Sequence, residues 1–390
     1  MARLIEITGK ALSGEWGIDD ENGKGVPVLR TTNFTNEGAI NYENVITRTI
    51  NKKNIEDKYL LKGDIIIEKS GGSDKQPVGR VVYFEGPDKK YLFNNFTGLL
   101  RINNKEKWYP KYVFYSLLTN YRRGGTCPFQ NKTTGLHNLK INDYISRYNI
   151  EEVDVNEQKK ICKKLNGIRT IILQKENQIK QLDTLIKARF VEMFGDPISN
   201  PMSWDKKILS EECEIITGNT PSRKVPEYYG NYIEWIKSDN INTPNAILTG
   251  AKEYLSEEGL KVARYVKEGS ILMTCIAGSL SCIGNVAIAN RAVAFNQQIN
   301  GIIPRKNDTW FMFVQFQLTK NYIQSTINMA LKGILSKTQL SQMEFIFPSV
   351  ELQREFGSFV TQVDKSKVAI QKSLEETQLL FDSLMQKYFG

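Results

Sequence analysis

The stretch VNEQKKI, residues 155–161, returns 195 positions later as VELQREF, residues 350–356, without a gap. The same spacing separates VEMFG, residues 191–195, from QKYFG, residues 386–390. A fixed internal period is typical of chains built from repeated structural units. Since 195 is half of the 390 residues, the sequence predicts two copies of one unit, each ending in the same kind of helix.

Both copies carry apolar residues at alternating spacings of three and four, which is the heptad pattern of a coiled coil. The first seam comprises Ile161, Leu165, Ile168, Ile172, Ile179, Leu182 and Ile186, and the second comprises Phe356, Val360, Val363, Ile370, Leu374, Phe381 and Leu384. Lys175, Arg189 and Lys367 interrupt the seams. For either helix alone, an amphipathic helix packed on its own domain is the alternative. The shared register favours a helical pair of about 36 residues, about 54 Å long at about 1.5 Å per residue, that holds two globular units at a fixed separation.

A globular module rich in strand-like runs and Gly-containing turns precedes each long helix. Its short β-branched runs predict a mixed α/β (α+β) module. The best-matched segments are 59–84 with 265–290, 26–34 with 233–241, and 93–100 with 295–303, and short helical patterns cover 109–120 and 310–321. The modules differ in loop length and loop residues, whereas the helices align without gaps. This contrast predicts that the two modules recognise different ligands or different parts of one ligand.

The repeat divides the chain into a first module at 1–155, a first helix at 156–195, a second module at 196–350 and a second helix at 351–390. The second module begins with DPISNPMSWDKKILSEEC, residues 196–213, which has no match before Met1. We therefore expect the repeat to be cyclically offset.

Composition is that of a globular protein with real cores, because 41% of the residues are hydrophobic. The five cysteines are Cys127, Cys162, Cys213, Cys275 and Cys282, and no C-x-x-C pair occurs. With no secretory leader at the start of the sequence, this pattern predicts reduced thiols and a cytoplasmic protein. The apolar run ILMTCIA, residues 271–277, is too short for a membrane span and reads as a buried strand.

The formal net charge of +9 favours an anionic partner such as nucleic acid. Its distribution is uneven, since residues 158–195 hold nine basic side chains against three acidic ones. The matching segment 353–390 has five of each. The first helix is therefore the more basic member of the pair.

Several catalytic classes lack their motifs. The chain has a single histidine, His137, which leaves histidine triads and multi-histidine metal sites without residues. No phosphate-binding G-x-x-x-x-G-K-[ST] loop occurs, and no two prolines are adjacent, which removes the proline pair that amino-methyltransferases use to hold their target nitrogen. In its Gly- and Thr-rich loop, His137 is expected to be a polar surface residue, with nucleic-acid contact as the alternative.

The stretch GDIIIEK contains Asp64, Glu68 and Lys69, the residue types of a metal-dependent nuclease. In that chemistry the second acid and the lysine lie two apart on one face of a strand. Here they are adjacent and should point to opposite faces. A turn followed by a buried strand is the favoured interpretation.

Gly-rich loops place cationic and amide side chains beside backbone that can approach a phosphate closely. These loops cover 69–80, 121–138, 217–231, 274–285 and 328–339. Arg and Lys suit phosphates and guanine edges, while Asn and Gln suit adenine. The candidate DNA-binding residues are Lys69, Lys75, Arg80, Arg122, Arg123, Gln130, Asn131, Lys132, His137, Arg223, Lys224, Lys332 and Lys337. About half of them are expected to be ordinary solvated loop charges.

Taken in order, GDIIIEKSGG with PVGR, TGNTPS, the helix starts NEQKKI and ELQREF, and the FGD that closes the first helix resemble a type I restriction-modification DNA specificity subunit. The resemblance extends over essentially the whole chain. It implies two target-recognition domains, each reading one half of a split site in double-stranded DNA, and an antiparallel coiled coil that sets the gap between them.

The resemblance also implies that this chain carries no catalytic residues, binds no cofactor and holds no metal. Two modification subunits would bind it, carry S-adenosylmethionine and methylate adenine in each half-site. Restriction subunits would add ATP-dependent translocation and cleavage. A stand-alone two-headed nucleic-acid-binding regulator without a methylase partner is the alternative, and a nuclease would require metal-dependent cutting by the chain alone.

Overall fold

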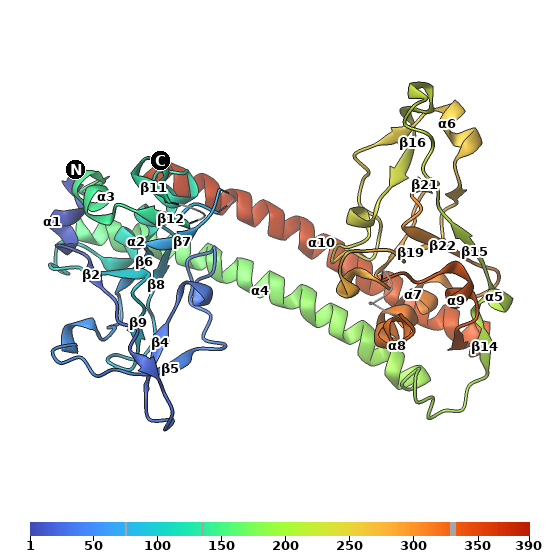
Figure 1. Ribbon diagram of the computed structural model, residues 1–390, viewed down its shortest axis with the longest axis horizontal. Helices are drawn as coiled ribbons and strands as arrows, with labels where there is room; N and C mark the ends of the chain where they lie inside the picture. Colours follow the sequence, from blue (N-terminus) through green and yellow to red (C-terminus); the bar gives the residue numbers. More distant parts are fainter. Residues whose placement is uncertain (75, 134–135, 328–332) are drawn as a thin grey trace. The chain divides into compact units, whose positions relative to one another are not determined.

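The structure is a computed structural model that describes residues 1–74, 76–133, 136–327 and 333–390 (Figure 1). The chain divides into two compact units, of which unit 1 comprises Met1–Gln174 with Ser373–Gly390 and unit 2 comprises Lys175–Lys372. Each unit contains one module and a part of both long helices, α4 (Val155–Phe194) and α10 (Val350–Phe389).

Unit 1 is built on small sheets covered by short helices. Its main antiparallel sheet has the order β2 (Leu12–Ser13), β10 (Thr97–Leu100), β6 (Ile65–Glu68), β8 (Val81–Tyr83). A second sheet, in which the last two strands are parallel, has the order β3 (Ile18–Asp19), β5 (Ile46–Thr49), β4 (Val26–Leu29), β9 (Leu92–Phe93). The other described strands form the sheets β11 (Gln130–Thr133), β12 (Leu136–Leu139), β7 (Ser70–Gly72) and β1 (Ala2–Arg3), β13 (Asn149–Ile150). The short helices are α1 (Leu4–Thr8), α2 (Pro110–Arg122) and α3 (Ile141–Arg147).

Unit 2 repeats the main sheet of this plan. Its main antiparallel sheet has the order β15 (Cys213–Thr217), β22 (Ile299–Pro304), β19 (Ile271–Thr274), β20 (Val286–Ile288). The second sheet has the order β17 (Tyr254–Leu255), β16 (Tyr229–Ile236), β21 (Val293–Phe295), β18 (Tyr265–Val266), with β16 and β21 parallel. The pair β14 (Lys206–Ile208), β23 (Glu344–Ile346) completes the described strands. The short helices are α5 (Leu209–Glu212), α6 (Glu257–Val262), α7 (Thr309–Leu318), α8 (Lys320–Ser325) and α9 (Lys337–Ser341).

The first residues of the chain correct one expectation. Strand β1 and helix α1 occupy in unit 1 the place that β14 and α5 occupy in unit 2, because β1 pairs with β13 just before α4 and β14 pairs with β23 just before α10. The expectation that the lead-in at 196–213 has no counterpart is therefore wrong for Lys206–Glu212, whose equivalent is Ala2–Thr8.

The two long helices pair antiparallel inside each unit, as the predicted coiled coil requires. In unit 2, Lys367 Nζ lies 2.6 Å from Asp183 Oδ1, and Arg189 Nη2 lies 3.4 Å from Glu355 Oε1. Residue numbers therefore rise along α4 in the direction in which they fall along α10. Every predicted seam position is buried or half-buried. Burial of this stripe from both sides stabilises the pair.

Two buried glutamines explain why the repeat is so regular at the helix starts. The side-chain Oε1 of Gln158 accepts a hydrogen bond from the backbone N–H of Tyr109 at 2.8 Å, and Gln353 Oε1 does the same with Asp308 at 3.0 Å. Tyr109 and Asp308 immediately precede α2 and α7. Both glutamines are fully buried, so each fastens the start of a long helix to the helix of its own module.

The repeated Phe-Gly at the helix ends has a packing role. Phe194 packs against Phe311 of α7 with ring centroids 4.9 Å apart, and Phe389 packs against Tyr112 of α2 at 5.0 Å. Gly195 follows α4 with a φ of 75°, the left-handed conformation that commonly ends a helix.

Within the described residues, no helix has the length and apolar character needed to cross a membrane.

Candidate nucleic-acid interface

Both modules start their exposed loops from the same constrained turn. Gly14 follows β2 and Gly218 follows β15. A Cβ at Gly14 would collide with the carbonyl oxygens of Phe93 and Asn94, and one at Gly218 would meet the equivalent carbonyls of the second module. Glycine is required because the chain passes directly over backbone there. The loops that follow are thereby placed at equivalent positions on the two sheets.

In unit 2 the loop after Gly218 brings Arg223 against the aromatic rings of strand β16, next to Lys237. The Arg223 guanidinium lies 4.4 Å from the ring centre of Tyr229 and 5.3 Å from that of Trp235, and Lys237 lies 5.1 Å from Trp235. Glu253 pairs with both cations, which raises the pKa of Arg223 and lowers that of the glutamate. Arg223 remains more than half exposed, so an ordered cation on an aromatic platform faces solvent.

Unit 1 also places a cation over an aromatic ring, but here the cation is mostly buried, with 11% of the Arg48 side chain exposed. Arg48 lies 4.5 Å from the ring centre of Trp16, donates through Nε to the Trp16 carbonyl at 3.1 Å and pairs with Asp19. Lys52 pairs with Glu15 at 2.7 Å. Sequence analysis missed Trp16 and Arg48, because they are 32 residues apart and only the pairing of β3 with β5 brings them together.

Arg80, a candidate DNA-binding residue, is turned inward. It donates to the carbonyls of Thr31 at 2.9 Å and Phe34 at 3.1 Å, and its guanidinium lies 3.4 Å from Glu68. Burial raises the pKa of the Glu68 carboxyl while Arg80 opposes the shift. Only 12% of the Arg80 side chain is exposed, so a contact between it and DNA stays a prediction that this conformation does not favour.

The acidic and lysine side chains of the GDIIIEK stretch each contact a different partner, so they do not form one site. Asp64 receives Arg101 through two hydrogen bonds, at 2.9 Å from Nε and 2.7 Å from Nη2. Lys69 donates to the Ser13 hydroxyl at 2.7 Å, and burial lowers its pKa. Among the described residues, no group of histidine, cysteine, aspartate or glutamate side chains is arranged to hold a metal ion.

His137 is not the surface loop residue that its neighbours suggested. It lies on β12, is 8% exposed, and its Nδ1 is 3.2 Å from Gln130 Oε1 on the paired strand β11. Its Nε2 is 3.5 Å from Asp74. The expectation failed because segment 121–138, read as a loop, contains a β-hairpin that buries the ring.

The remaining candidates fall in three groups. Arg122, Arg123, Asn131, Lys224 and Lys337 have exposed side chains, although Arg122 Nη1 also lies 3.6 Å from Asp382 of α10. Lys132 pairs with His137 through its backbone in β11. Lys75 and Lys332 lie outside the described residues. The structure thus brings together Gln130 with His137 and places the exposed candidates on separate elements. Arg122 ends α2, Asn131 lies on β11 and Lys337 begins α9, while Arg123 and Lys224 lie in turns.

Two modules with equivalent sheets, differently composed exposed loops and a shared helical pair define a class of tandem-repeat protein that presents two related surfaces. The chain belongs to the type I restriction modification DNA specificity family, because the family's DNA specificity domain matches residues 3–183 and again residues 201–378.

Curated relatives agree with this assignment. The MjaIX specificity subunit of Methanocaldococcus jannaschii is 27% identical over 170 residues, which cover 42% of this chain and 38% of the relative. The HindI specificity subunit of Haemophilus influenzae is 28% identical over 186 residues, covering 46% and 39%. The chain thus matches about two fifths of the length of either relative.

Solved structures support the fold. The S subunit of a type I restriction-modification system from M. genitalium aligns with all of this chain and 95% of its own, with a TM-score of 0.60 and 15% identity. A structure concerned with complex assembly of the type I system aligns with all of this chain and 96% of its own, with a TM-score of 0.55 and 16% identity. The repeated module with two long helices is therefore an established architecture.

Proposed function

We propose that this chain is the DNA specificity subunit of a type I restriction-modification complex and that each module reads one half of a split target in double-stranded DNA. Family membership supports the DNA-binding role. The single observation that carries the two-part reading is the contrast between equivalent main sheets and differently composed cation–aromatic clusters, Arg223 with its aromatic platform in unit 2 and the mostly buried Arg48 over Trp16 in unit 1. Two modules with the same main sheet and different surrounding residues suit a DNA target whose two halves differ in sequence.

Within this proposal the exposed candidates contact DNA directly. Arg122, Arg123, Arg223, Lys224 and Lys337 supply charge for phosphates and guanine edges, while Asn131 can pair with an adenine edge. The inward-facing Arg80, Gln130 and His137 would instead hold the loops that carry these contacts.

The chemistry is assigned to partners. The chain itself would be non-catalytic, two modification subunits would bring S-adenosylmethionine and methylate adenine, and restriction subunits would bring ATP-dependent translocation and cleavage. The basic face of α4 would lie over the spacer DNA, and the length of the helical pair would set the spacer.

Genome-wide mapping of methylated adenines tests this proposal. The modification subunits expressed with this chain should produce a split methylated motif, and the same subunits without it should produce none. The same methylated motif in cells with and without this chain would contradict its role as the specificity subunit.

A stand-alone regulator remains the second candidate, since the basic charge also suits such a protein. A pull-down of the tagged chain with the modification subunit separates the two. Complex formation supports the specificity subunit, whereas tight DNA binding without any complex supports the regulator.

A further inference from the structure

Unit 2 contains a cavity of about 370 Å³ whose described lining carries two lysines and no acidic residue. We call it the Lys320 cavity. Its lysine and amide side chains are those of Lys187, Asn242, Asn245, Asn285, Gln317 and Lys320. A positive cavity lined by amide donors is suited to an anion.

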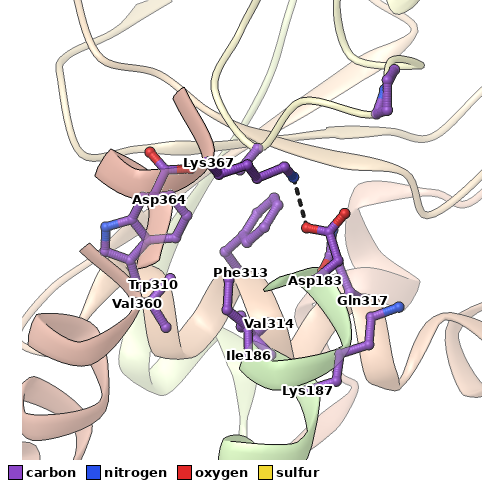
Figure 2. A pocket seen from close by; sticks show the side chains of 12 residues that line it. Asp183, Ile186, Lys187, Trp310, Phe313, Val314, Gln317, Val360, Asp364 and Lys367 are labelled. Atoms are coloured by element: carbon purple, nitrogen blue, oxygen red, sulfur yellow. Dashed lines mark hydrogen bonds and ion pairs between the residues drawn. The ribbon is translucent and has the colours of Figure 1, made fainter. Parts of the chain in front are cut away.

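Two other cavities of unit 2 carry acidic as well as basic side chains. The cavity of about 120 Å³ in Figure 2 shares Lys187 and Gln317 with the Lys320 cavity, but it is also lined by Asp183 and Asp364, and Asp183 pairs with Lys367 at 2.6 Å. A third cavity, of about 430 Å³, contains acidic residues beside its lysines. Of these three cavities, only the Lys320 cavity has an unbalanced positive charge.

A hydrogen-bond chain fixes the direction of the donors in the Lys320 cavity. Lys320 Nζ donates to Asn285 Oδ1 and to the Ser281 carbonyl, and Asn285 Nδ2 donates to Asn242 Oδ1 at 2.8 Å. An ammonium group can only donate, so Asn285 must turn its oxygen to Lys320 and its NH₂ to Asn242. Asn242 must then offer its oxygen to Asn285. Its own NH₂ is left as a donor at the end of the chain, and Lys320 keeps a third N–H.

Amide side chains hold both loops that form the walls. The loop containing Asn242 follows Asn240, which is 6% exposed and donates to the Gly250 carbonyl at 2.9 Å. The turn before Asn285 is held by Gln324, which donates to the carbonyls of Leu280 and Ile283 at 2.8 and 2.9 Å. The donors are therefore pre-organised, which lowers the entropy cost of binding.

The equivalent position in unit 1 is closed. Arg80 corresponds to Asn285, because each follows a glycine with positive φ and accepts a hydrogen bond through its carbonyl from the end of the central strand, from Glu68 at 2.8 Å and Thr274 at 2.9 Å. In unit 1 the side chain is locked into the pair with Glu68. The open, positive form of this position is found in unit 2.

We propose that the Lys320 cavity binds a phosphate of the DNA backbone beside the half-site read by unit 2. An extended polyanion fits better than a small free phosphate, because Lys180 lies two helical turns from Lys187 on the same face of α4, and Asp183 between them is paired with Lys367 at 2.6 Å. This inference rests on the proposed DNA-binding function.

The test uses the full-length chain and a duplex carrying the motif found by methylation mapping. Binding is measured by fluorescence anisotropy at several salt concentrations for wild type, Lys187→Met, the double variant Lys187→Met with Lys320→Met, and Asn242→Asp. The slope of log Kd against log salt should fall by about 0.9 for each phosphate that a variant no longer neutralises. Asn242→Asp should also weaken binding, because it places a carboxylate beside the phosphate.

Lys306→Met is the matched control, since Lys306 lines the separate cavity of about 430 Å³ and its Nζ lies 3.9 Å from Glu212. Lys187 is an exposed side chain on α4, so its variant should fold, and thermal unfolding of each variant checks this.

The outcomes separate the two proposals. Wild type that binds no duplex overturns the DNA-binding function and this inference with it. Duplex binding by the double variant with the slope of Lys306→Met overturns the phosphate site alone. If inorganic phosphate or ATP raises the Tm of wild type but not of the double variant, while duplex binding is equal, the cavity serves a small anion and the proposal is wrong.

Discussion

Gln353 connects sequence and structure most directly at the residue scale. The fixed offset identifies it as the counterpart of Gln158 in the second repeat. The structure explains why glutamine occurs there, since its amide is buried and hydrogen-bonded through both its oxygen and its nitrogen. Its Nε2 donates to the Pro348 carbonyl and to Asn307 Oδ1, each at 2.9 Å. Both buried acceptors depend on this one side chain.

Gln353→Ala should therefore lower the free energy of unfolding by about 1–3 kcal/mol, because it leaves buried polar groups without partners. Urea unfolding measures the change. Gln362→Ala, at an exposed position of the same helix, should change it by less than about 0.5 kcal/mol. Equal stability of the two variants would show that the buried amide is dispensable.

The cysteines give a second prediction at this scale. Burial raises the pKa of Cys162, Cys213 and Cys275 to about 12, whereas Cys127 is exposed. Because the thiolate is the reactive form, a thiol reagent at about pH 8 should label Cys127 rapidly in the native protein and the three buried thiols only after unfolding. Mass spectrometry of the labelled peptides reads the order, and early modification of Cys275 would contradict it.

Some residues could not be predicted because their roles depend on the meeting of distant segments. The hydrogen-bond chain of the Lys320 cavity joins two turns, at Asn242 and Asn285, to the start of α8 at Lys320, and no spacing in the sequence links these three positions. Charge makes Arg80 a DNA-binding candidate, but the pair that buries it depends on Glu68 in the neighbouring strand. Charge alone does not tell a buried partner from a free one.

The long helices are the element that the sequence predicted best. Heptad spacing depends only on local periodicity, so the seam from Ile161 to Ile186 follows without knowledge of the fold. The partner of the seam cation Lys367 was not predictable, because Asp183 lies outside the heptad seam and the antiparallel register sets the meeting.

The ion pair of Lys367 with Asp183 can be tested by a double-mutant cycle. Asp183→Leu should lower the free energy of unfolding by about 1 kcal/mol, since it leaves the Lys367 ammonium half-buried without this partner while water screens the exposed side. Adding Lys367→Leu should restore at least wild-type stability, because an apolar seam needs no desolvated charge. A double variant less stable than Asp183→Leu would count against this.

At the scale of the whole molecule, the duplication itself was readable from the sequence and the loops were not. The equivalent sheets and the repeated family match agree with the predicted repeat. The expectation that residues 196–213 have no counterpart was wrong for Lys206–Glu212, because seven residues at the start of the chain form the matching strand and helix in spite of little sequence likeness. Pairing to the strand before the long helix, rather than identity, defines that element.

Independent reading by the two modules is the central claim, and module exchange tests it most directly. Residues 1–150 are replaced by the corresponding segment of another family member, the chimera is expressed with the same modification subunits, and methylated adenines are mapped across the genome. We predict that one half of the methylated motif changes while the other half and the spacer stay the same, and that exchange of residues 196–350 changes the opposite half. A change in both halves after a single exchange would contradict the account.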